Sequence, residues 1–313
     1  MSPLVTVIIP VFNCASFVAE AIESALLQDW PHKEVVVVND GSTDDSLTVL
    51  RGFGDRIRVI DQKNAGPPAA RNQGIAAALG AYIAFLDADD VWIQGKLSAQ
   101  VRHLEAHPDV HTVFTNWHVW EPGTDGRFRY PLEIERLLVA DQIDEANSGW
   151  LYHRLLLDCE LLTTTVMLRA SMVRQIGGFD LSLWNGDDYD YWLRASREGK
   201  IAKLQSVGAL YRCVPGSVSR KPNPINYGHQ VISQAVSRWG LAGPDGSAAD
   251  DVTMQRRLLR LQAEHAYVHL RRGDPKIAYR TYGQILKSHP ARLSFWVHMA
   301  HASLKMAWSG FRN

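Results

Sequence analysis

The chain contains the stretch Tyr82-Ile83-Ala84-Phe85-Leu86-Asp87-Ala88-Asp89-Asp90, in which a short apolar run passes directly into three aspartates. A run this short, built from aromatic and aliphatic residues, predicts a buried strand. Ligands of α/β sheets bind beyond the carboxyl ends of the strands, so Asp87 and Asp89 would lie at a binding edge. Two such carboxylates can hold a divalent cation and, through it, a diphosphate. The alternative is a solvated acidic turn that caps a helix beginning near Gln94.

Strand-like and helix-like segments alternate through the first 115 residues. Strands are expected at 4–10, 34–39, 56–60, 82–86 and 110–114, and later at 163–169 and 207–211. Helices are expected at 16–28, from the polar turn after residue 39 through about residue 50, and at 69–79. This alternation predicts an α/β fold whose mostly parallel sheet carries helices on both faces.

The chain changes character near residues 240–250, where Gly, Ala, Pro and Asp cluster. Helical spacing follows at 254–271, 275–287 and 293–308. Residues at spacings similar to one tetratricopeptide unit are Ala266, Gly273, Ala278, Tyr282 and Pro290. A single unit cannot bury its own apolar face, so these helices are expected to pack as an appendage. Segment 293–308 is amphipathic, with three candidate partners: a membrane surface, the first part of the chain, or a second copy in a dimer.

The composition is that of an ordinary globular protein, with 46% hydrophobic and 21% charged residues. Lys and Arg number 33, as do Asp and Glu. A formal net charge of zero argues against nucleic acid as a partner, because neutralising a phosphate backbone needs a basic surface. Three widely spaced cysteines, Cys14, Cys159 and Cys213, fit a reducing compartment and no zinc cluster.

The N-terminal residues lack a basic segment followed by an apolar one, so no signal peptide is visible. No apolar run approaches the ~20 residues that span a bilayer. A cytoplasmic protein is therefore expected, at most peripheral at the inner face of the membrane.

Two more loops would lie at the same sheet edge as Asp87. The first expected strand runs into Pro10-Val11-Phe12-Asn13, and the second ends in Asn39-Asp40-Gly41-Ser42-Thr43-Asp44. Asp40 can accept a hydrogen bond from the imide N–H of uracil or a similar base, and Gly41 permits a sharp turn. Without a ligand, the same loop would be a strand-to-helix turn with a capping side chain.

Asn64-Ala65-Gly66 and Ala69-Ala70-Arg71-Asn72 form a loop that enters a helix. Arg71 would lie in the first turns of this helix, where a guanidinium can reach a phosphate or a base. The alternative is an arginine that faces solvent, the common state of that residue.

Four carboxylates lie within eleven residues, at Asp180, Asp187, Asp188 and Asp190. A carboxylate serves as a general base when burial or neighbouring charge raises its pKa toward the working pH. The alternative is a set of acidic residues that the helix dipole favours at a helix N-terminus. Trp184, just before this segment, can stack on a sugar ring, although core packing is the usual role of a tryptophan.

Taken together, these motifs resemble the family 2 glycosyltransferases of the GT-A fold, over about residues 4–220 and in the same order. The matching segments are 7–13, 39–44, 64–66 with 70–72, 85–90, 178–180, 187–193, 211–212 and 215–219. The resemblance implies a catalytic domain at 1–240, with a nucleotide-binding half at 1–115 and an acceptor half at 116–240, followed by a helical region at 250–313.

The resemblance also implies an inverting, metal-dependent transfer from a nucleotide diphosphate sugar to an acceptor hydroxyl. A UDP-sugar is favoured as the donor, and the acceptor would be a saccharide or glycolipid of bacterial surface polysaccharide synthesis. By this resemblance the nucleotide site comprises Pro10, Phe12, Asn13, Asp40, Asn64, Gly66, Arg71 and Asp87. Asp89, as the more direct ligand, and Asp87 would bind Mg²⁺ or Mn²⁺, which would neutralise the charge that develops on the leaving diphosphate.

Asp188 falls on the catalytic aspartate of the family and would take the proton of the acceptor hydroxyl, with Asp187 and Asp190 as competing candidates. Asp90 is expected only to cap the following helix. Three positions depart from the family pattern: Asn39 stands where members often have Asp, Asp187 where they often have Glu, and Val214 where many carry His. The last departure puts a histidine contact to metal or diphosphate in doubt.

Two other functions fit parts of the pattern. A strand followed by Asp-x-Asp also resembles the nucleophile loop of haloacid dehalogenase-type phosphatases, in which Asp87 would be phosphorylated. That interpretation leaves the loop at 39–44 unexplained. A non-catalytic nucleotide-sugar binding module would keep Asp40 and the Asp-x-Asp but lack a base, and the presence of Asp188 argues against it.

Overall fold

The computed structural model describes residues 2–131, 142–214 and 221–310. The chain divides into two compact units, Met1–Pro215 with Ala242–Ser247, and Gly216–Leu241 with Ala248–Asn313. The segment 221–241 thus groups with the C-terminal helices, whereas the sequence placed it with the first part of the chain. Helix α8 (Tyr227–Trp239) accounts for this, because the side chain of its N-cap residue, Asn226, donates to Leu261 O at 2.9 Å. The functional division into 1–240 and 250–313 stays a prediction.

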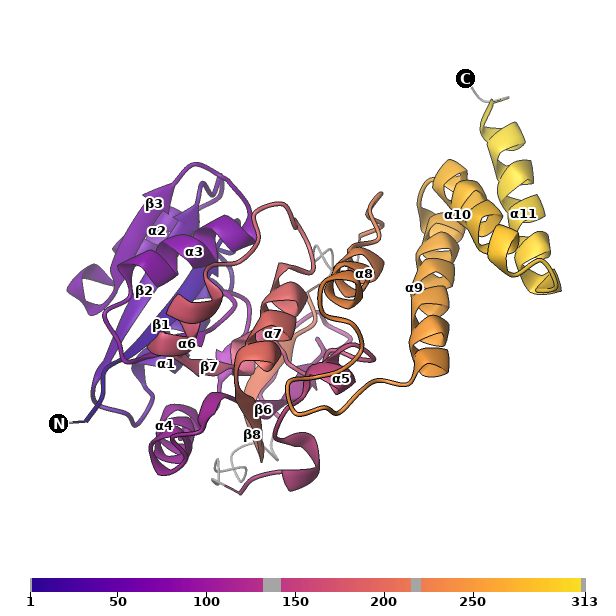
Figure 1. Cartoon of the computed structure of the whole chain (residues 1–313). Coiled ribbons are helices and arrows are strands. Elements are labelled where there is room, and N and C mark those ends of the chain that lie inside the picture. Colours follow the sequence, from indigo (N-terminus) through magenta and orange to yellow (C-terminus); the bar gives the residue numbers. More distant parts are fainter. Residues whose placement is uncertain (1, 132–141, 215–220, 311–313) are drawn as a thin grey trace. The chain divides into compact units, whose positions relative to one another are not determined.

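The first unit is built on an eight-stranded sheet within the described residues (Figure 1). The strands are β1 (Val5–Val11), β2 (Lys33–Asp40), β3 (Arg58–Gln62), β4 (Tyr82–Phe85), β5 (Val91–Trp92), β6 (Val110–Trp120), β7 (Met167–Arg169) and β8 (Lys200–Arg212). Their order is β3-β2-β1-β4-β7-β6-β8-β5. The first four run parallel, β7 runs antiparallel to both of its neighbours, and β5 runs antiparallel to β8. The predicted α/β fold with a mostly parallel sheet is confirmed.

Two strands are longer than the sequence predicted and one is shorter. β6 and β8 pair with each other from Val110↔Lys200 to Trp120↔Arg212, and this mutual pairing extends both. The strand expected at 163–169 is confined to β7, because Thr163–Thr165 form a 3₁₀ turn. Pairing between strands is tertiary information, which explains why local apolar patterning missed these ends.

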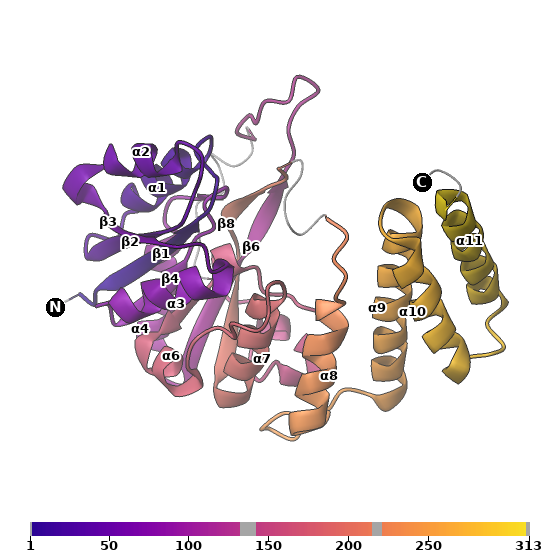
Figure 2. The same cartoon turned by 90° about the horizontal axis from the view of Figure 1, so that it is seen from above.

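Helices cover both faces of this sheet (Figure 2). They are α1 (Val18–Leu26), α2 (Ser46–Arg51), α3 (Pro67–Ala77), α4 (Lys96–Ala106), α5 (Tyr152–Leu155), α6 (Ala170–Ile176) and α7 (Asp187–Glu198). Side chains of a strand alternate between faces. Val7 and Ile9 of β1 accordingly share a core with Ile22 of α1, while Ile8 faces Gly74 of α3 on the other side.

The strand order reverses at β1. This strand pairs with β2 on one side and with β4 on the other, all parallel. Ligands of open α/β sheets bind at such a switch point, outside the carboxyl ends of the strands. The loops after β1, β2 and β4 therefore meet at one edge, as the sequence predicted.

The second unit is helical and contains α8, α9 (Asp251–Arg272), α10 (Pro275–Ser288) and α11 (Leu293–Gly310). The three helices predicted beyond residue 250 are confirmed within a few residues. Asp250 and Asp274 begin α9 and α10 by accepting from Thr253 N and Lys276 N. Their shared core is small and includes Tyr282. Among the described helices, none combines the length and hydropathy needed to cross a bilayer.

The contact between α3 and β1 gives a first prediction. A Cβ atom at Gly74 would lie 2.3 Å from Ile8 Cγ2, closer than packed atoms tolerate. We expect Gly74→Ala to lower the free energy of unfolding by about 1–3 kcal/mol through overpacking. Gly283→Ala in α10 is the control, because a Cβ there has its nearest neighbour, Met299 Sδ, at 3.8 Å. That variant should gain up to ~1 kcal/mol of helix propensity. Urea unfolding measures both, and equal effects would contradict this packing.

Candidate active site

The loops after β1 and β2 are tied together by side chains. Asn13, whose φ is +49°, accepts from Thr43 N at 2.7 Å through its Oδ1. Its own N–H donates to Ser42 Oγ at 3.0 Å, and Ala15 N donates to Asp44 Oδ2 at 3.0 Å. Asparagine tolerates this left-handed conformation better than most residues. The two motifs are therefore one polar structure at the sheet edge.

Asp40 is buried at the end of β2, where it shapes the loop that leads into α3. Its Oδ1 accepts from Gln62 Nε2 at 2.7 Å and from Ala65 N at 2.9 Å, and its Oδ2 accepts from Gly66 N at 2.9 Å. Only 3% of Asp40 is exposed. The carboxylate thus holds the backbone around Gly66, and its expected hydrogen bond to a base stays a prediction.

The same edge carries exposed aromatic surface. Phe12, at the end of β1, is 50% exposed, and Pro10 beside it is half-buried. Trp184, from the loop before α7, lies against Gly66, where a Cβ would be 2.9 Å from Trp184 Cζ3. Gly66 also has φ +90°, so both its conformation and its neighbour require glycine. Asn64 approaches the β2 loop equally closely, since a Cβ at Gly41 would lie 2.6 Å from Asn64 N.

Arg71 of α3 joins two distant segments. Its Nη2 donates to Asp87 Oδ1 at 3.0 Å and its Nη1 donates to Asp187 Oδ2 at 2.7 Å. The guanidinium also lies over Phe179, 5.4 Å from the ring centroid. With 7% of Arg71 exposed, the solvent-facing alternative is wrong. A planar guanidinium can bind two carboxylates at once, so Arg71 connects the turn after β4 to the start of α7.

The turn after β4 is also held from β8. Arg212 N donates to Asp90 Oδ1 at 2.9 Å, and Arg212 Nε donates to Asp89 O at 2.6 Å. Asp90 is fully buried, and α4 has Gly95 as its N-cap with no capping side chain. The expectation that Asp90 caps this helix is therefore wrong, because its carboxylate binds β8 instead.

The Arg212 guanidinium occupies an aromatic cage. It lies 4.2 Å from the ring centroid of Trp120 and 4.7 Å from those of Phe17 and Phe128, and it pairs with Glu20. Cation–π contacts of this kind strengthen as water is excluded. From the sequence, Arg212 belongs to a segment that matches the family, but no role was predicted for it. The continuation of that segment, Pro215–Ser219, lies outside the described residues.

Asp87 and Asp89 are close enough for their charges to interact. Burial, and then the charge of Asp87, raise the pKa of Asp89 to about 6. Among the described residues, no three His, Cys, Asp or Glu side chains cluster as a complete metal site. Mg²⁺ is commonly bound through one or two carboxylates plus water and substrate phosphates. The two aspartates fit a cation of that kind, which would relieve their mutual repulsion.

The three aspartates at the start of α7 have different environments. Asp187 is 4% exposed and pairs with Arg71, and burial raises its pKa to about 6. Asp190 pairs with Arg194 at 2.8 Å. Asp188 makes no ion pair within the described part of the chain; its Oδ2 accepts from Thr163 Oγ1 at 3.2 Å. Thr163 was not expected from the sequence, because it lies in the turn that replaces the predicted strand.

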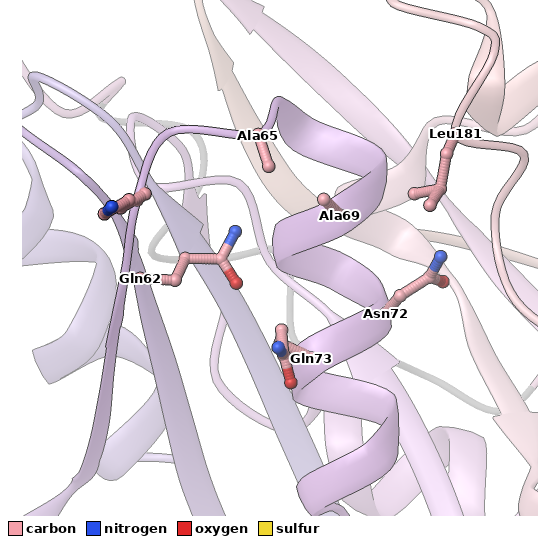
Figure 3. A pocket seen from close by; sticks show the side chains of 7 residues that line it. Gln62, Ala65, Ala69, Asn72, Gln73 and Leu181 are labelled. Carbon is pink, nitrogen blue, oxygen red and sulfur yellow. The ribbon is translucent and has the colours of Figure 1, made fainter.

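A hollow of about 380 Å³ lies on the outer face of α3 (Figure 3). Its lining residues are Gln62, Lys63, Ala65, Ala69, Asn72, Gln73 and Leu181. None of the aspartates described above lines it. The Asn72 side chain is already bound to the backbone N and O of Phe179. The hollow therefore adjoins the loop that Asp40 holds, through Gln62 and Ala65, without including the aspartates of the sheet edge.

Known proteins share both sequence and fold with this chain. The family model described as glycosyl transferase family 2 matches residues 6–158. An uncharacterised glycosyltransferase of Rickettsia prowazekii is 33% identical over 64% of this chain and 61% of its own length. The UDP-Glc:alpha-D-GlcNAc-diphosphoundecaprenol beta-1,3-glucosyltransferase WfaP of Escherichia coli is 31% identical over 69% of this chain and 80% of its own length. The chain spans about 36% and 31% of two other Rickettsia relatives.

Solved structures agree on the fold. The crystal structure of S. aureus TarS 1–349 in complex with UDP-GlcNAc has a TM-score of 0.63 and 18% identity, and the match covers 91% of this chain and 81% of that one. The mannosyltransferase PcManGT from Pyrobaculum calidifontis, in complex with GDP-Man and Mn²⁺, has a TM-score of 0.54 and 17% identity, over 99% of this chain and 88% of that one.

The sheet order and these structures define a protein of the GT-A fold class. The chain belongs to glycosyl transferase family 2. The predicted family and fold are thus confirmed. The phosphatase alternative is set aside, because family and fold are those of glycosyltransferases and because Asp87 is bound to Arg71.

Arg71 gives a second prediction. Arg71→Gln would leave Asp187 buried without a cation, which should cost about 3–5 kcal/mol of unfolding free energy. Burial already raises the pKa of Asp187 from 3.8 to about 6, and losing Arg71 would raise it further. The folded state then binds the extra proton, so stability should fall as the pH rises through the folded pKa. We expect a larger loss at about pH 7.5 than at about pH 5, measured by urea unfolding.

The double variant Arg71→Gln/Asp187→Asn is the control. It removes both charges, so it should recover part of the loss and show a weaker pH dependence. If the single and double variants were equally unstable at both pH values, the buried ion pair would not be what Arg71 contributes.

Proposed function

We propose that this protein transfers a sugar, with inversion, from a nucleotide diphosphate sugar to an acceptor hydroxyl. The observation that carries the proposal is the double pairing of Arg71 with Asp87 and Asp187. It brings the Asp-x-Asp turn, where a diphosphate would bind, next to the start of α7, where an acceptor would bind. Asp188 lies at that junction, and of the three aspartates that begin α7 it is the one without an ion pair within the described residues.

The nucleotide would bind over the loops after β1, β2 and β3. Pro10 and Phe12 would face the base, and Asp40 with Asn13 and Asn64 would shape its pocket. For Asp40 to contact the base, the base edge must share or replace the hydrogen bonds that this carboxylate now accepts from the loop. UDP is the favoured nucleotide because the E. coli relative is named for UDP-Glc and the S. aureus structure holds UDP-GlcNAc.

A divalent cation would be held by Asp89 and Asp87 together with the diphosphate oxygens. Mg²⁺ or Mn²⁺ at this position supplies positive charge where the leaving diphosphate becomes more negative. The support for a cation is that the Pyrobaculum calidifontis mannosyltransferase of similar fold was solved with GDP-Man and Mn²⁺ together. Arg212 would hold Asp89 in position, because its Nε donates to the backbone carbonyl of Asp89.

Asp188 would act as the general base. The acceptor oxygen forms a bond to the anomeric carbon while its proton passes to an Asp188 carboxylate oxygen. The bond from the anomeric carbon to the diphosphate breaks, and the diphosphate leaves with the electron pair. Attack from the face opposite the leaving group inverts the configuration. Thr163 would orient the Asp188 carboxylate, and the exposed part of Trp184 would stack on a sugar ring.

The acceptor proposed is a saccharide or glycolipid of bacterial surface polysaccharide synthesis. The support is the name of the E. coli relative, which acts on a GlcNAc-diphosphoundecaprenol. A thermal-shift panel of UDP-, GDP- and dTDP-sugars with and without Mn²⁺ tests the donor, because a ligand of the native state raises its stability by mass action. A metal-dependent shift with one nucleotide class is expected, and no shift with any of them would overturn the proposal.

The raised pKa of Asp89 gives a third prediction. Burial and the charge of Asp87 raise this pKa to about 6, so the proton competes with a cation below that pH. We expect the Mn²⁺-dependent stabilisation by UDP to grow as the pH rises from about 5 to about 7. Asp89→Asn should abolish this metal-dependent part, whereas a metal response that survives in Asp89→Asn would place the cation elsewhere.

The base assignment gives a fourth prediction. Asp188→Asn should lower the rate of UDP release in the presence of acceptor by about 10²–10⁴-fold, the usual contribution of a general base, while UDP binding is retained. Asp190→Asn is the control, because its carboxylate pairs with Arg194, and it should keep most of the rate. Full transfer by Asp188→Asn with intact donor binding would move the base to another residue, whereas donor binding without any transfer by the wild type would favour a non-catalytic binding module.

A further inference from the structure

The charge of the chain is unevenly divided between its two ends. Residues 251–313 hold 11 Lys and Arg against 3 Asp and Glu, whereas residues 1–250 hold 22 against 30. The overall balance of zero therefore hides a strongly basic helical region. Such an asymmetry is typical of proteins that bind an anionic partner through one part of the chain.

Helix α11 has one face packed and one face bare. Phe295 stacks on Tyr282 of α10 with centroids 5.8 Å apart, and Ala302 is fully buried in the same core. The opposite face is apolar and exposed at Leu293 (76%), Trp296 (47%), Val297 (66%), Leu304 (66%) and Trp308 (73%). We call these five residues the α11 stripe. In both views α11 is the outermost helix of its unit (Figures 1 and 2).

The spacing of the α11 stripe places its members on one side of the helix, since positions 293, 296, 297, 304 and 308 follow the i, i+3, i+4 and i+7 pattern of one helix face. Terminal helices of helical arrays usually present a polar outer face to remain soluble. Here the only Lys, Arg, Asp or Glu between 293 and 310 is Lys305, and its Nζ donates to Leu270 O at 2.8 Å on the packed side. An uncharged apolar face of this kind marks an interaction surface.

Exposed basic residues lie near both ends of helix α11. Lys287 lies in the last turn of α10 and Arg292 immediately precedes Leu293 in the chain, and both are exposed. At the other end, the bond from Lys305 to Leu270 brings α11 to the C-terminus of α9, where Arg271 and Arg272 follow and are exposed. Helices that lie in a membrane interface combine an apolar face of Trp and Leu with nearby Lys and Arg, and here the basic residues come from the segments next to α11.

We propose that the α11 stripe and the basic residues around it dock the protein on an anionic lipid surface. Tryptophan favours the interface between headgroups and acyl chains, where its ring is half apolar and half polar. The arginines and lysines would contact the negatively charged headgroups. A second copy is a poorer occupant, because pairing two such faces would bring two strongly basic units together. A nucleic acid would leave the uncharged stripe without a partner.

Vesicle sedimentation of the whole chain tests this. The protein should pellet with vesicles of phosphatidylcholine and phosphatidylglycerol, much less with phosphatidylcholine alone, and less again at high salt. Leu304→Ser/Trp308→Ser should weaken binding about tenfold or more. Leu27→Ser/Leu79→Ser is the matched control, because it also removes two exposed apolar side chains, at 64% and 73%, but from the first unit, and it should bind as the wild type does.

Three results would overturn the proposal: no binding to anionic vesicles, equal binding by Leu304→Ser/Trp308→Ser and wild type, or a concentration-dependent dimer in ultracentrifugation that this variant abolishes. Stabilisation by UDP, measured on the same preparations, reports the donor site separately. Loss of lipid binding with intact UDP binding would therefore concern only the α11 stripe.

Discussion

The site depends on the two ion pairs that the buried guanidinium of Arg71 makes with Asp87 and Asp187. A buried charge is tolerated only when it is paired, and Arg71 meets that requirement with two carboxylates from different parts of the chain. Asp87 follows β4, and Asp187 begins α7, 100 residues later along the sequence. Because one guanidinium binds both carboxylates, it fixes the position of the proposed diphosphate edge relative to the helix that would hold the acceptor.

The aspartates at this edge divide into two groups by their partners. Asp40, Asp90 and Asp187 are buried and bound by the protein, through a loop backbone, a strand backbone and an arginine respectively. They fix the positions of loops. Asp89 and Asp188 make no ion pair within the described residues, and they are the carboxylates proposed to meet the cation and the acceptor. Loops fixed in this way would hold Asp89 and Asp188 in place for the ligands proposed above.

The sequence allowed much of the first unit to be predicted. Apolar runs such as 82–86 and the alternation with helices led to a mostly parallel sheet, because burial and side-chain period are local properties of the chain. The role of Asp90 was predicted wrongly, and Thr163 and the aromatic cage of Arg212 were missed. Each of these three contacts joins residues more than 20 positions apart in the chain, so no local sequence pattern predicts it. The grouping of α8 with the C-terminal helices likewise follows from a long-range contact, between Asn226 and Leu261.

By itself the sequence determined the family, the order of the motifs and the edge at which they gather, because strand ends and residue types are written along the chain. Only the tertiary structure decided which aspartates are paired and which are not, since ion pairs form between residues that folding brings together. It also decided that α11 leaves an apolar stripe bare, because burial of a helix face depends on what packs against it. Periodicity had shown that this helix has such a face, and the packing of α9 and α10 showed which side is covered.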